Sequence, residues 1–487
     1  MYHAPPHVLQ CYFFTKDVSN VIDTGRVKES RFNPSTRIKE LVTVWTSRAS
    51  AKQRAGRAGR TSAGVCWKLF SEKFAEEYMP DQTSPEIVRT PLDELVLQVC
   101  LLYEQRRDEQ ANETLAKFPI GACPMRFLAN TPEPPPEDSL RKACIHLLEV
   151  DALRIVKKHP VLYRLTPLGY HLSRLPMDAK VGKILIVGCM LECLNSALTI
   201  AATLSCTKSC FSNRWGKTDK MHDSKVEARS RLIESGFGGR DWKGGTVKGD
   251  LMAAVAVYKE WTIRSNDTER ASFCRSYALD CIAMKEIHRL RNQFLDCLSD
   301  AGFLHLGLNH YNKSEDDALL TSCCLVAGLY PNICTLTRPR KGGFKDGRLL
   351  TKEGDVCLPG SSSFQRHRVA KTSITGKDAY AVYHAKHRSL GAGGQSGQVF
   401  LSEVNFISRH ALILFGGELD VRRNAIIVDD WLKFKVTDKG ITGAVLLLTL
   451  RSELDKCMLK HIVPSKNEGK HENERLIMII RQLLAEE

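Results

Sequence analysis

The sequence predicts a multidomain protein of mixed class: an α/β segment, then a helical segment, then a β-rich segment with C-terminal helices. Three observations predict this class. Residues 18–70 read as strand, helix and strand, residues from Pro85 onward carry helical periodicity, and short alternating runs typical of strands begin near residue 345. The 487 residues exceed one ordinary core, and typical domain size favours about three or four domains.

Composition and charge narrow the class of partner. Hydrophobic residues make up 43% of the chain and charged residues 26%, so burial can offset the entropy of ordering over most of its length. The net charge of +15 favours a polyanionic partner, and nucleic acid is favoured over a membrane because no basic amphipathic helix stands out. The longest apolar run, residues 184–191, is shorter than the about 20 residues that span a bilayer.

The 17 cysteines are spread through helical apolar stretches, and the first residues lack the layout of a secretory signal, so reduced intracellular thiols are expected. Two C-x3-C pairs, Cys189/Cys193 and Cys206/Cys210, suggest zinc. Structural zinc sites usually bring C-x2-C knuckles or paired histidines, so we interpret these cysteines as buried helical residues and expect no metal site.

The α/β segment is built from strands on either side of a short helix. Residues 18–25 (VSNVIDTG) read as a buried strand ending at a polar turn, and residues 41–46 (LVTVWT) as another strand. The charges and Asn-Pro between them favour an exposed loop or hairpin. A short helix is expected from Ser50 to residue 60, and residues 65–70 (VCWKLF) form the strand that completes the unit.

The helical segment divides into two parts. Helices over 91–105 and 139–153, with a short strand and a helix in 162–176, fit a winged helix, and Thr166 is expected as the N-cap of the last helix. Two longer helical regions, 178–206 and 270–300, predict a bundle. In the second region, apolar side chains at three-to-four spacing form a core-facing stripe: Phe273, Tyr277, Met284, Ile287, Phe294 and Leu298.

The β-rich segment is predicted from four runs, AYAVYH, QVFLSEV, HALILF and NAIIVDDWLKFKV, which Gly/Ser loops such as GAGGQSG separate. They indicate a small β-barrel, and an oligonucleotide-binding barrel would suit the basic charge. After it, the tail returns to amphipathic helix.

Residues 53–60, QRAGRAGR, are the strongest functional signal. On a helix, Gln53, Arg57 and Arg60 fall at i, i+4 and i+7, within roughly 60° of one another, while Arg54 points elsewhere. Two guanidinium groups on one face suit the terminal phosphate of a nucleotide, as arginine fingers do. Two other interpretations stay open: a capping box that starts at Ser50 and uses Gln53, or a flexible RNA-binding Arg-Gly segment.

This segment, preceded by VIDTGRVKE, resembles the last conserved motif and the preceding strand of the DEAH-box RNA helicases. Further similar stretches follow in the family's order: PEIVRTPLDEL, EPPPEDS, LTPLGYHLSRLP, GKIL, ALTIAATLS, LRNQF, AGLYPN, VYH and ALILFGG. The resemblance covers most of residues 18–430, and the large members linked to translation and RNA structure look most similar. It implies that Gln53, Arg57 and Arg60 touch the γ-phosphate of ATP, with Arg57 and Arg60 as catalytic fingers.

The resemblance also implies a domain order. Residues 1–16 lie outside the fold, and the segments after them are the end of a second RecA-like domain (17–84), a winged helix (85–175), a ratchet-like helical domain (176–305), an oligonucleotide-binding barrel (306–436) and a C-terminal helical extension (437–487). The resemblance implies that single-stranded RNA threads between these domains and that ATP and Mg²⁺ are the cofactors. It also implies ribonucleoprotein or ribosome-associated partners and a cytoplasmic or nuclear location.

Arginine fingers only complete an ATP site, so the phosphate-binding loop must be found as well. The Gly-Lys-Thr at 216–218 lacks the glycine that the loop needs at 211, where Phe211 stands. Gly391, Gly393 and Gly397 miss a dinucleotide fingerprint, and DELV at 93–96 lacks the histidine of a DEAH box. We therefore expect a truncated or mis-started chain, without the first RecA-like domain, that does not hydrolyse ATP alone.

RNA contact is expected to be electrostatic and tolerant of sequence. The densest basic run lies around the start of the predicted barrel: Arg338, Arg340, Lys341, Lys345, Arg348, Arg366, Arg368 and Lys371. The serines of LPGSSSF, where the family places an RNA contact, lack the expected histidine. The leading hypothesis is the C-terminal portion of an ATP-dependent 3′-to-5′ RNA helicase, and the alternative is a non-catalytic RNA-binding or scaffold protein.

Overall fold

The computed structural model describes most of the chain in two compact units. The first unit comprises Met1–Leu92 and Met125–Ala143, and the second comprises Asp93–Pro124 and Cys144–Glu487. The described residues are 18–33, 38–59, 63–110, 121–175, 177–206, 208–211, 220–235, 249–315, 317–337, 347–360, 363, 380–390, 396–422, 425–435, 441–462 and 470–485.

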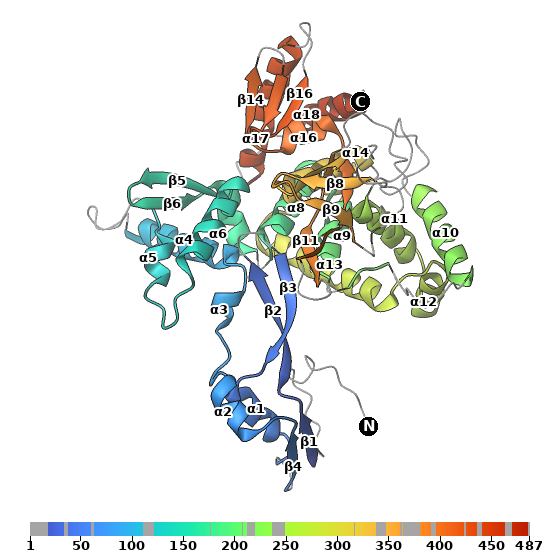
Figure 1. The fold of residues 1–487 in the computed structure, drawn as a ribbon. Helices are drawn as coiled ribbons and strands as arrows, with labels where there is room; N and C mark the ends of the chain where they lie inside the picture. The colour runs from blue at the N-terminus through green and yellow to red at the C-terminus, as the bar shows by residue number, and fades with distance from the viewer. Residues whose placement is uncertain are drawn as a thin grey trace, which may run out of the picture. The chain divides into compact units, whose positions relative to one another are not determined.

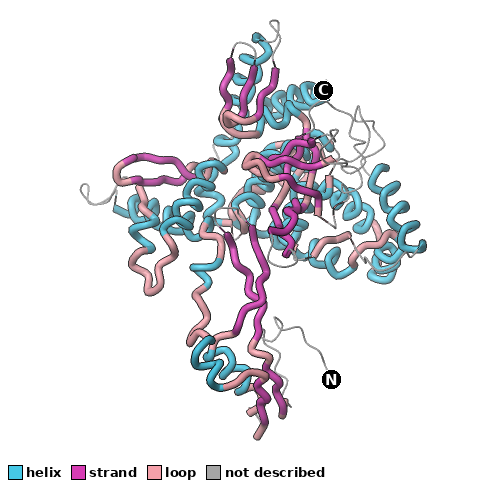
Figure 2. Tube along the Cα trace, in the orientation of Figure 1, coloured by secondary structure: helices cyan, strands magenta, loops and turns pink. Residues whose placement is uncertain are grey.

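The first unit contains the predicted strand, helix, strand arrangement. Strands β1 (Asn20–Asp23) and β4 (Val65–Lys68) pair in parallel, and α1 (Arg48–Ala55) lies between them in sequence (Figure 1). Residues between β1 and α1 form the hairpin of β2 (Arg26–Asn33) and β3 (Ile38–Trp45), which Figure 2 shows as a long two-stranded ribbon. Two short helices follow, α2 (Glu72–Tyr78) and α3 (Glu86–Arg89). The hairpin prediction is confirmed, although its strands extend further than expected.

The strand predicted in residues 18–25 is present as β1, but the prediction that it is buried is wrong. Ile22 of β1 is 63% exposed and Trp67 of β4 is 60% exposed, because β1 and β4 form only a two-stranded sheet in the described part of the chain. Burial on both faces of a parallel strand requires covering layers. Asp23, at the end of β1, is the buried residue of that strand.

The second unit begins with helices and a small hairpin. Its elements are α4 (Asp93–Gln110), α5 (Pro124–Leu128), α6 (Glu137–Glu149), β5 (Leu153–Lys158), β6 (Val161–Leu165) and α7 (Pro167–Arg174), although parts of α5 and α6 fall in the first unit. DELV opens α4, where Asp93 Oδ1 lies 2.6 Å from His146 Nδ1. The predicted cap is confirmed, because Thr166 Oγ1 accepts a hydrogen bond from the Gly169 amide at 2.9 Å.

The predicted bundle is present and densely buried. It comprises α8 (Ala179–Met190), α9 (Leu194–Ser205), α10 (Lys220–Ser235), α11 (Asp250–Thr262), α12 (Asp267–Ser276), α13 (Cys281–Asp300), the 3₁₀ turn η2 (His310–Asn312) and α14 (Ala318–Leu329). The stripe of α12 and α13 is buried except for the half-buried Tyr277. A break follows Ser276, where Ala278 adopts a φ of 49°, so region 270–300 is two helices rather than one.

A seven-stranded sheet follows the bundle. Its strands are β7 (Ile333–Thr337), β8 (Arg348–Thr351), β9 (Val356–Pro359), β10 (Tyr380–Val382), β11 (Ala385–Leu390), β12 (Ser396–Ser402) and β13 (Asn405–Ile407), in the order β11-β12-β9-β8-β7-β10-β13. Strands β9 and β12 pair in parallel, whereas the other neighbours are antiparallel. Gly397 lies in β12, which pairs antiparallel with β11, so the predicted Gly/Ser loop GAGGQSG falls in sequence between two paired strands and includes the first two residues of β12.

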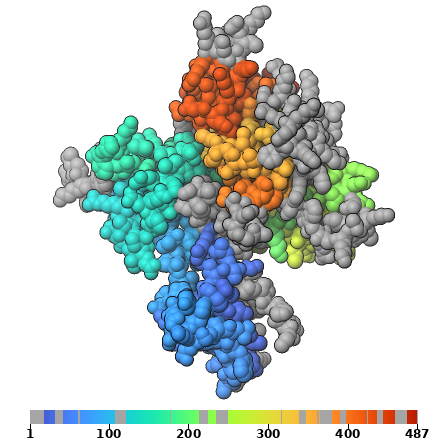
Figure 3. All heavy atoms as spheres, viewed as in Figure 1, coloured from blue at the N-terminus to red at the C-terminus, as the bar shows by residue number. Residues whose placement is uncertain are grey.

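Two predictions about the β-rich segment need correction. HALILF is not a strand but part of helix α16 (Arg409–Phe415), which Ser408 caps through the Ala411 amide at 2.9 Å. NAIIVDDWLKFKV does not join the seven-stranded sheet. It forms β15 (Ala425–Val428) and β16 (Leu432–Lys435) of a separate sheet with β14 (Leu419–Arg422). The two sheets are neighbours, because Lys352 Nζ, just after β8, lies 3.9 Å from Asp429 Oδ2, just after β15. In Figure 3 the amber and orange-red parts of the surface lie side by side.

The tail is helical as predicted, in α17 (Ile441–Ile462) and α18 (Lys470–Ala485). Helix α17 packs against α16 and α7, and Arg451 of α17 donates to the carbonyl oxygen of Ile413 at 3.0 Å. Among the described helices, none is both long and apolar enough to cross a membrane.

Candidate functional site

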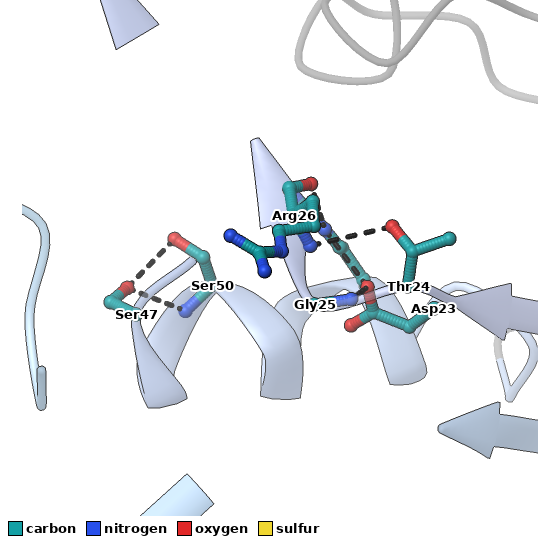
Figure 4. A network of polar contacts seen from close by, with 7 residues as sticks. Asp23, Thr24, Gly25, Arg26, Ser47 and Ser50 are labelled. Carbon is teal, nitrogen blue, oxygen red and sulfur yellow. Dashed lines mark hydrogen bonds and ion pairs between the residues drawn. The ribbon is translucent and has the colours of Figure 1, made fainter. Parts of the chain in front are cut away.

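The site predicted from QRAGRAGR is built on α1, whose start is fixed by Ser47. The Ser47 hydroxyl accepts from the Ser50 amide at 3.1 Å and lies 3.0 Å from the Ser50 hydroxyl (Figure 4). The hydroxyl of Thr83 lies 3.1 Å from that of Ser47. The helix therefore begins one turn before the Ser50–Gln53 capping box considered from sequence, and that interpretation is wrong.

The next amides of α1 are also satisfied. The Arg48 amide donates to the Pro80 carbonyl at 2.8 Å, and the Ala49 amide donates to the Asp81 carbonyl at 3.1 Å. Because the first amides of a helix have no partner within it, these bonds to the segment after α2 hold the start of α1 in place.

The end of α1 differs from the prediction. The helix stops at Ala55, with Gly56 as C-cap, instead of continuing to residue 60. The amides of Arg57 and Ala58 then donate to carbonyl groups three residues earlier, at 3.1 Å each, so the chain tightens into a turn. Ala58 is 2% exposed, and a Cβ on Gly64 would collide with its carbonyl oxygen. Close packing against Gly64 therefore ends the helix early.

Two of the three predicted γ-phosphate residues are described, and both are exposed. Gln53 lies in the last turn of α1 and Arg57 in the turn that follows it. Arg60 lies outside the described residues. An amide and a guanidinium group that face solvent beside a backbone fixed by Ala58 can donate hydrogen bonds to an anion.

Arg54 points elsewhere, as predicted, and its partner is a residue that sequence reasoning did not select. Its Nη1 atom lies 2.9 Å from Asp23 Oδ1 and 3.3 Å from the Arg26 carbonyl oxygen. Asp23 Oδ1 also accepts from the Gly25 amide at 2.9 Å, a contact drawn in Figure 4. An aspartate followed two residues later by glycine at a strand end is a turn signal that could have identified Asp23.

Most predicted RNA-contacting residues cannot be placed. Seven of them lie outside the described residues: Arg338, Arg340, Lys341, Lys345, Arg366, Arg368 and Lys371. Arg348 is half-buried in β8, and its carbonyl oxygen accepts from the Thr337 hydroxyl at 2.9 Å. Residues 216–218, Gly391 and Gly393 also lie outside the described part. Of the serines in LPGSSSF, Ser363 donates to Asp250 Oδ1 at 3.0 Å.

The cysteines singled out as possible ligands are mostly buried, as expected. Cys189, Cys193 and Cys210 are buried and Cys206 is half-buried. Burial raises the pKa of the Cys189 thiol to about 12. Cys193 Sγ lies 3.4 Å from Cys324 Sγ rather than beside a histidine. In the described part of the chain, no group of three or more His, Cys, Asp or Glu side chains could hold a metal ion.

Comparison with known proteins identifies the helical bundle. Residues 178–254 match the helicase-associated domain (HA2), ratchet-like, which covers α8 to the start of α11. This first part of the bundle is therefore similar to a helicase-associated domain.

Relatives over most of the chain identify the family. The chain is 30% identical over 483 residues to the putative ATP-dependent RNA helicase DHX57 of Mus musculus, covering 91% of this chain and 31% of the relative. It is 30% identical to the DExH-box ATP-dependent RNA helicase DExH1 of Arabidopsis thaliana, covering 96% of this chain and 42% of the relative. It is 29% identical to the ATP-dependent DNA/RNA helicase DHX36 of Homo sapiens, covering 90% of this chain and 39% of the relative. The chain belongs to the DEAH-box helicase family and spans less than half the length of these relatives.

Proposed function

We propose that this chain is the C-terminal portion of an ATP-dependent 3′-to-5′ RNA helicase, which supplies arginine fingers to an ATP site and grips single-stranded RNA. Gln53, Arg57 and Arg60 contact the γ-phosphate, and residues 17–84 are the end of a RecA-like domain. Three further domains hold RNA without reading its sequence: a winged helix, the ratchet-like bundle and an oligonucleotide-binding barrel. The seven-stranded sheet forms the barrel.

One observation carries the proposal: Arg57 and Gln53 are both exposed at the end of a helix whose start and end are fixed. Ser47 and the carbonyl groups of Pro80 and Asp81 hold the start, and the buried Ala58 holds the turn. Arg54 is bound to Asp23, whereas Arg57 is exposed to solvent, where its guanidinium group can meet an anion. Fixed donors of this kind stabilise charge that develops on a transferred phosphoryl group.

ATP and Mg²⁺ need further residues. The exposed amide of Gln53 and the guanidinium of Arg57 fit the terminal phosphate of ATP, whose hydrolysis with Mg²⁺ supplies the free energy for moving along RNA. Asp23 does not fit a magnesium ligand, because its buried carboxylate is bound to Arg54 and to the Gly25 amide. The 487 residues contain no G-x-x-x-x-G-K-[ST] pattern, so the phosphate-binding loop is proposed to come from another lobe.

The exposed apolar residues of the small parallel sheet support such a lobe. Ile22, Val65, Trp67 and Leu69 are 63%, 49%, 60% and 64% exposed, respectively. Neighbouring strands and helices of a RecA-like domain would cover them. Ribonucleoprotein or ribosome-associated partners and a cytoplasmic location are further parts of the proposal.

The test is ATP hydrolysis with and without RNA. The 487-residue chain alone is expected to show no turnover, and a polypeptide that joins it to a lobe with a phosphate-binding loop is expected to hydrolyse ATP. In that polypeptide, Arg57→Ala should lower kcat by about 1,000-fold or more, as loss of an arginine finger does. Arg275→Ala, which removes an exposed arginine of α12, is the matched control and should leave kcat unchanged.

RNA-stimulated turnover by the 487 residues alone would refute the proposal, as would an Arg57→Ala protein with unchanged kcat. RNA binding that persists while Arg57→Ala has no effect on ATP hydrolysis would instead support the RNA-binding scaffold.

A further inference from the structure

One guanidinium group joins helix α1 to the base of the β2–β3 hairpin. Arg54 Nη1 donates both to Asp23 Oδ1, at the end of β1, and to the carbonyl oxygen of Arg26, the first residue of β2. The Asp23 side chain is 1% exposed and that of Arg54 is 26% exposed. A charged pair with one partner so deeply buried is weakly screened by solvent, so it constrains geometry more than a surface pair does. We call these contacts the Arg54 bridge.

The second strand of the hairpin is attached to α1 through the chain itself. Strand β3 ends at Trp45, and Thr46 is the single residue before the N-cap Ser47. The Thr46 amide donates to the Gly25 carbonyl at 2.8 Å, which closes the hairpin base against the turn after β1. Both Thr46 and Ser47 are buried. No flexible linker therefore separates β3 from α1.

The turn that carries these contacts is closely packed. Gly25 has a φ of 68°, and a Cβ there would lie 2.7 Å from Phe70 Cδ1 and 2.8 Å from Met79 Cε. The Arg26 guanidinium carbon lies 3.4 Å from the centre of the Trp45 ring, so side chains of both strands stack at the base. Each strand has eight residues, so a small rotation of the base is amplified over about 25 Å of hairpin.

We infer that Arg54 is a positioning residue that couples the β2–β3 hairpin to Arg57 through the Arg54 bridge. A displacement of α1 when Arg57 engages a phosphate moves both hairpin strands, β3 through Ser47 and β2 through Arg54. A load on the hairpin moves Arg57 in the reverse direction. The inference rests on the proposed function, because it assigns to Arg54 the transmission between the nucleotide and the rest of the RNA-binding chain.

The position requires a cation that can donate twice. Arg54 Nη1 donates to a carboxylate and to a carbonyl oxygen at once, and the guanidinium stays charged at any ordinary pH. In the described part of the chain, Asp23 Oδ2 makes no hydrogen bond, so Arg54 is the cation that compensates the buried carboxylate. Without Arg54 the carboxylate is left uncompensated, and the turn at Gly25 loses the contact that ties it to α1.

The first measurement uses the 487-residue chain alone, by hydrogen exchange. Arg54→Gln should speed exchange of the Thr46 amide by about tenfold or more, since a charge-assisted contact at its base is lost. The matched control is Arg48→Gln, which removes an exposed ion pair with Asp81 in the first turn of the same helix and should leave that amide unchanged. Unchanged exchange of Thr46 in Arg54→Gln would show that the bridge does not hold the hairpin base.

The second measurement uses the ATP-hydrolysing polypeptide. Arg54→Gln and Asp23→Asn should each lower the ratio of RNA-stimulated to basal kcat by about tenfold, with the KM for ATP within about twofold. Because both remove the same contact, the double variant should lose no more than either single variant. Arg54→Lys should recover part of the ratio.

The outcomes separate this inference from the proposed function. If Arg57→Ala leaves kcat unchanged, the proposed function is wrong, and the coupling assigned to Arg54 is wrong with it. If Arg57→Ala abolishes turnover but Arg54→Gln leaves the RNA stimulation ratio within twofold, the arginine finger stands and only the coupling is wrong. Additive losses in the double variant would also overturn it, because they would show that Arg54 and Asp23 act separately.

Discussion

Replacing Glu403 by glutamine should stabilise the protein at pH 8 and hardly at all at pH 5. Glu403 follows β12 with a φ of 51°, and burial raises the pKa of its carboxyl group to about 8, with the negative charge of Asp250 adding to the effect. Asp250 is 2% exposed, and both of its carboxylate oxygens accept hydrogen bonds. Oδ2 accepts from the Val404 amide at 2.9 Å, and Oδ1 accepts from the Ser363 hydroxyl at 3.0 Å.

The sign follows from which state holds the proton. Between the ordinary pKa of 4.5 and the folded value of about 8, the folded protein keeps the proton of Glu403 while the unfolded chain releases it. The free energy of unfolding therefore falls as pH rises through this window. Each pKa unit corresponds to about 1.4 kcal/mol, so the full penalty is on the order of 5 kcal/mol above pH 8. Glutamine keeps the shape of the side chain and removes the ionisation.

The assay is chemical denaturation of the whole chain at pH 5 and pH 8. Glu403→Gln should flatten the loss of stability between these values, whereas Glu418→Gln, at an exposed position in the same unit, should leave the slope unchanged. Asp250→Ala should destabilise at both pH values, because the buried Val404 amide loses its partner at a cost of about 1–3 kcal/mol. A Glu403→Gln protein with the same pH slope as the original would refute the reasoning.

Two further predictions concern local backbone. Gly25→Ala should destabilise the hairpin base by about 1–2 kcal/mol or more, because the φ of 68° at Gly25 disfavours a residue with a side chain. Hydrogen exchange of the Thr46 amide, which donates to the Gly25 carbonyl, should then be faster, and unchanged exchange would contradict this prediction. Thr166→Ala should lower the free energy of unfolding by about 1 kcal/mol in chemical denaturation, because α7 loses its N-cap. Thr166→Ser keeps the hydroxyl that accepts from the Gly169 amide and should have little effect. Equal losses in both variants would contradict the capping role.

Helix α1 shows how far the local sequence pattern reaches. The presence of the helix, the strands before and after it, and the orientation of Arg54 away from Gln53 and Arg57 follow from local periodicity. The early end at Ala55 does not, because it depends on Ala58 packing against Gly64, a contact with the next strand. The partner of Arg54 was also hidden, since Asp23 is 31 residues away in sequence.

The β-rich segment shows the same division. HALILF is short and apolar, so periodicity alone does not distinguish strand from helix, and the cap at Ser408 decides for helix α16. β15 and β16 were placed correctly as strands but in the wrong sheet, because sheet membership is a long-range pairing that local pattern does not encode.

By itself, the sequence determined the order of α/β, helical and β-rich segments and the family, and it predicted the residues suited to a phosphate, because these depend on periodicity, spacing and side-chain chemistry along the chain. Only the tertiary structure decided where α1 ends, that Asp23 and Arg54 join it to the hairpin, and that Asp250 and Glu403 share a buried junction. The physical reason is that contacts between distant residues set burial and electrostatics, and those energies override local preference.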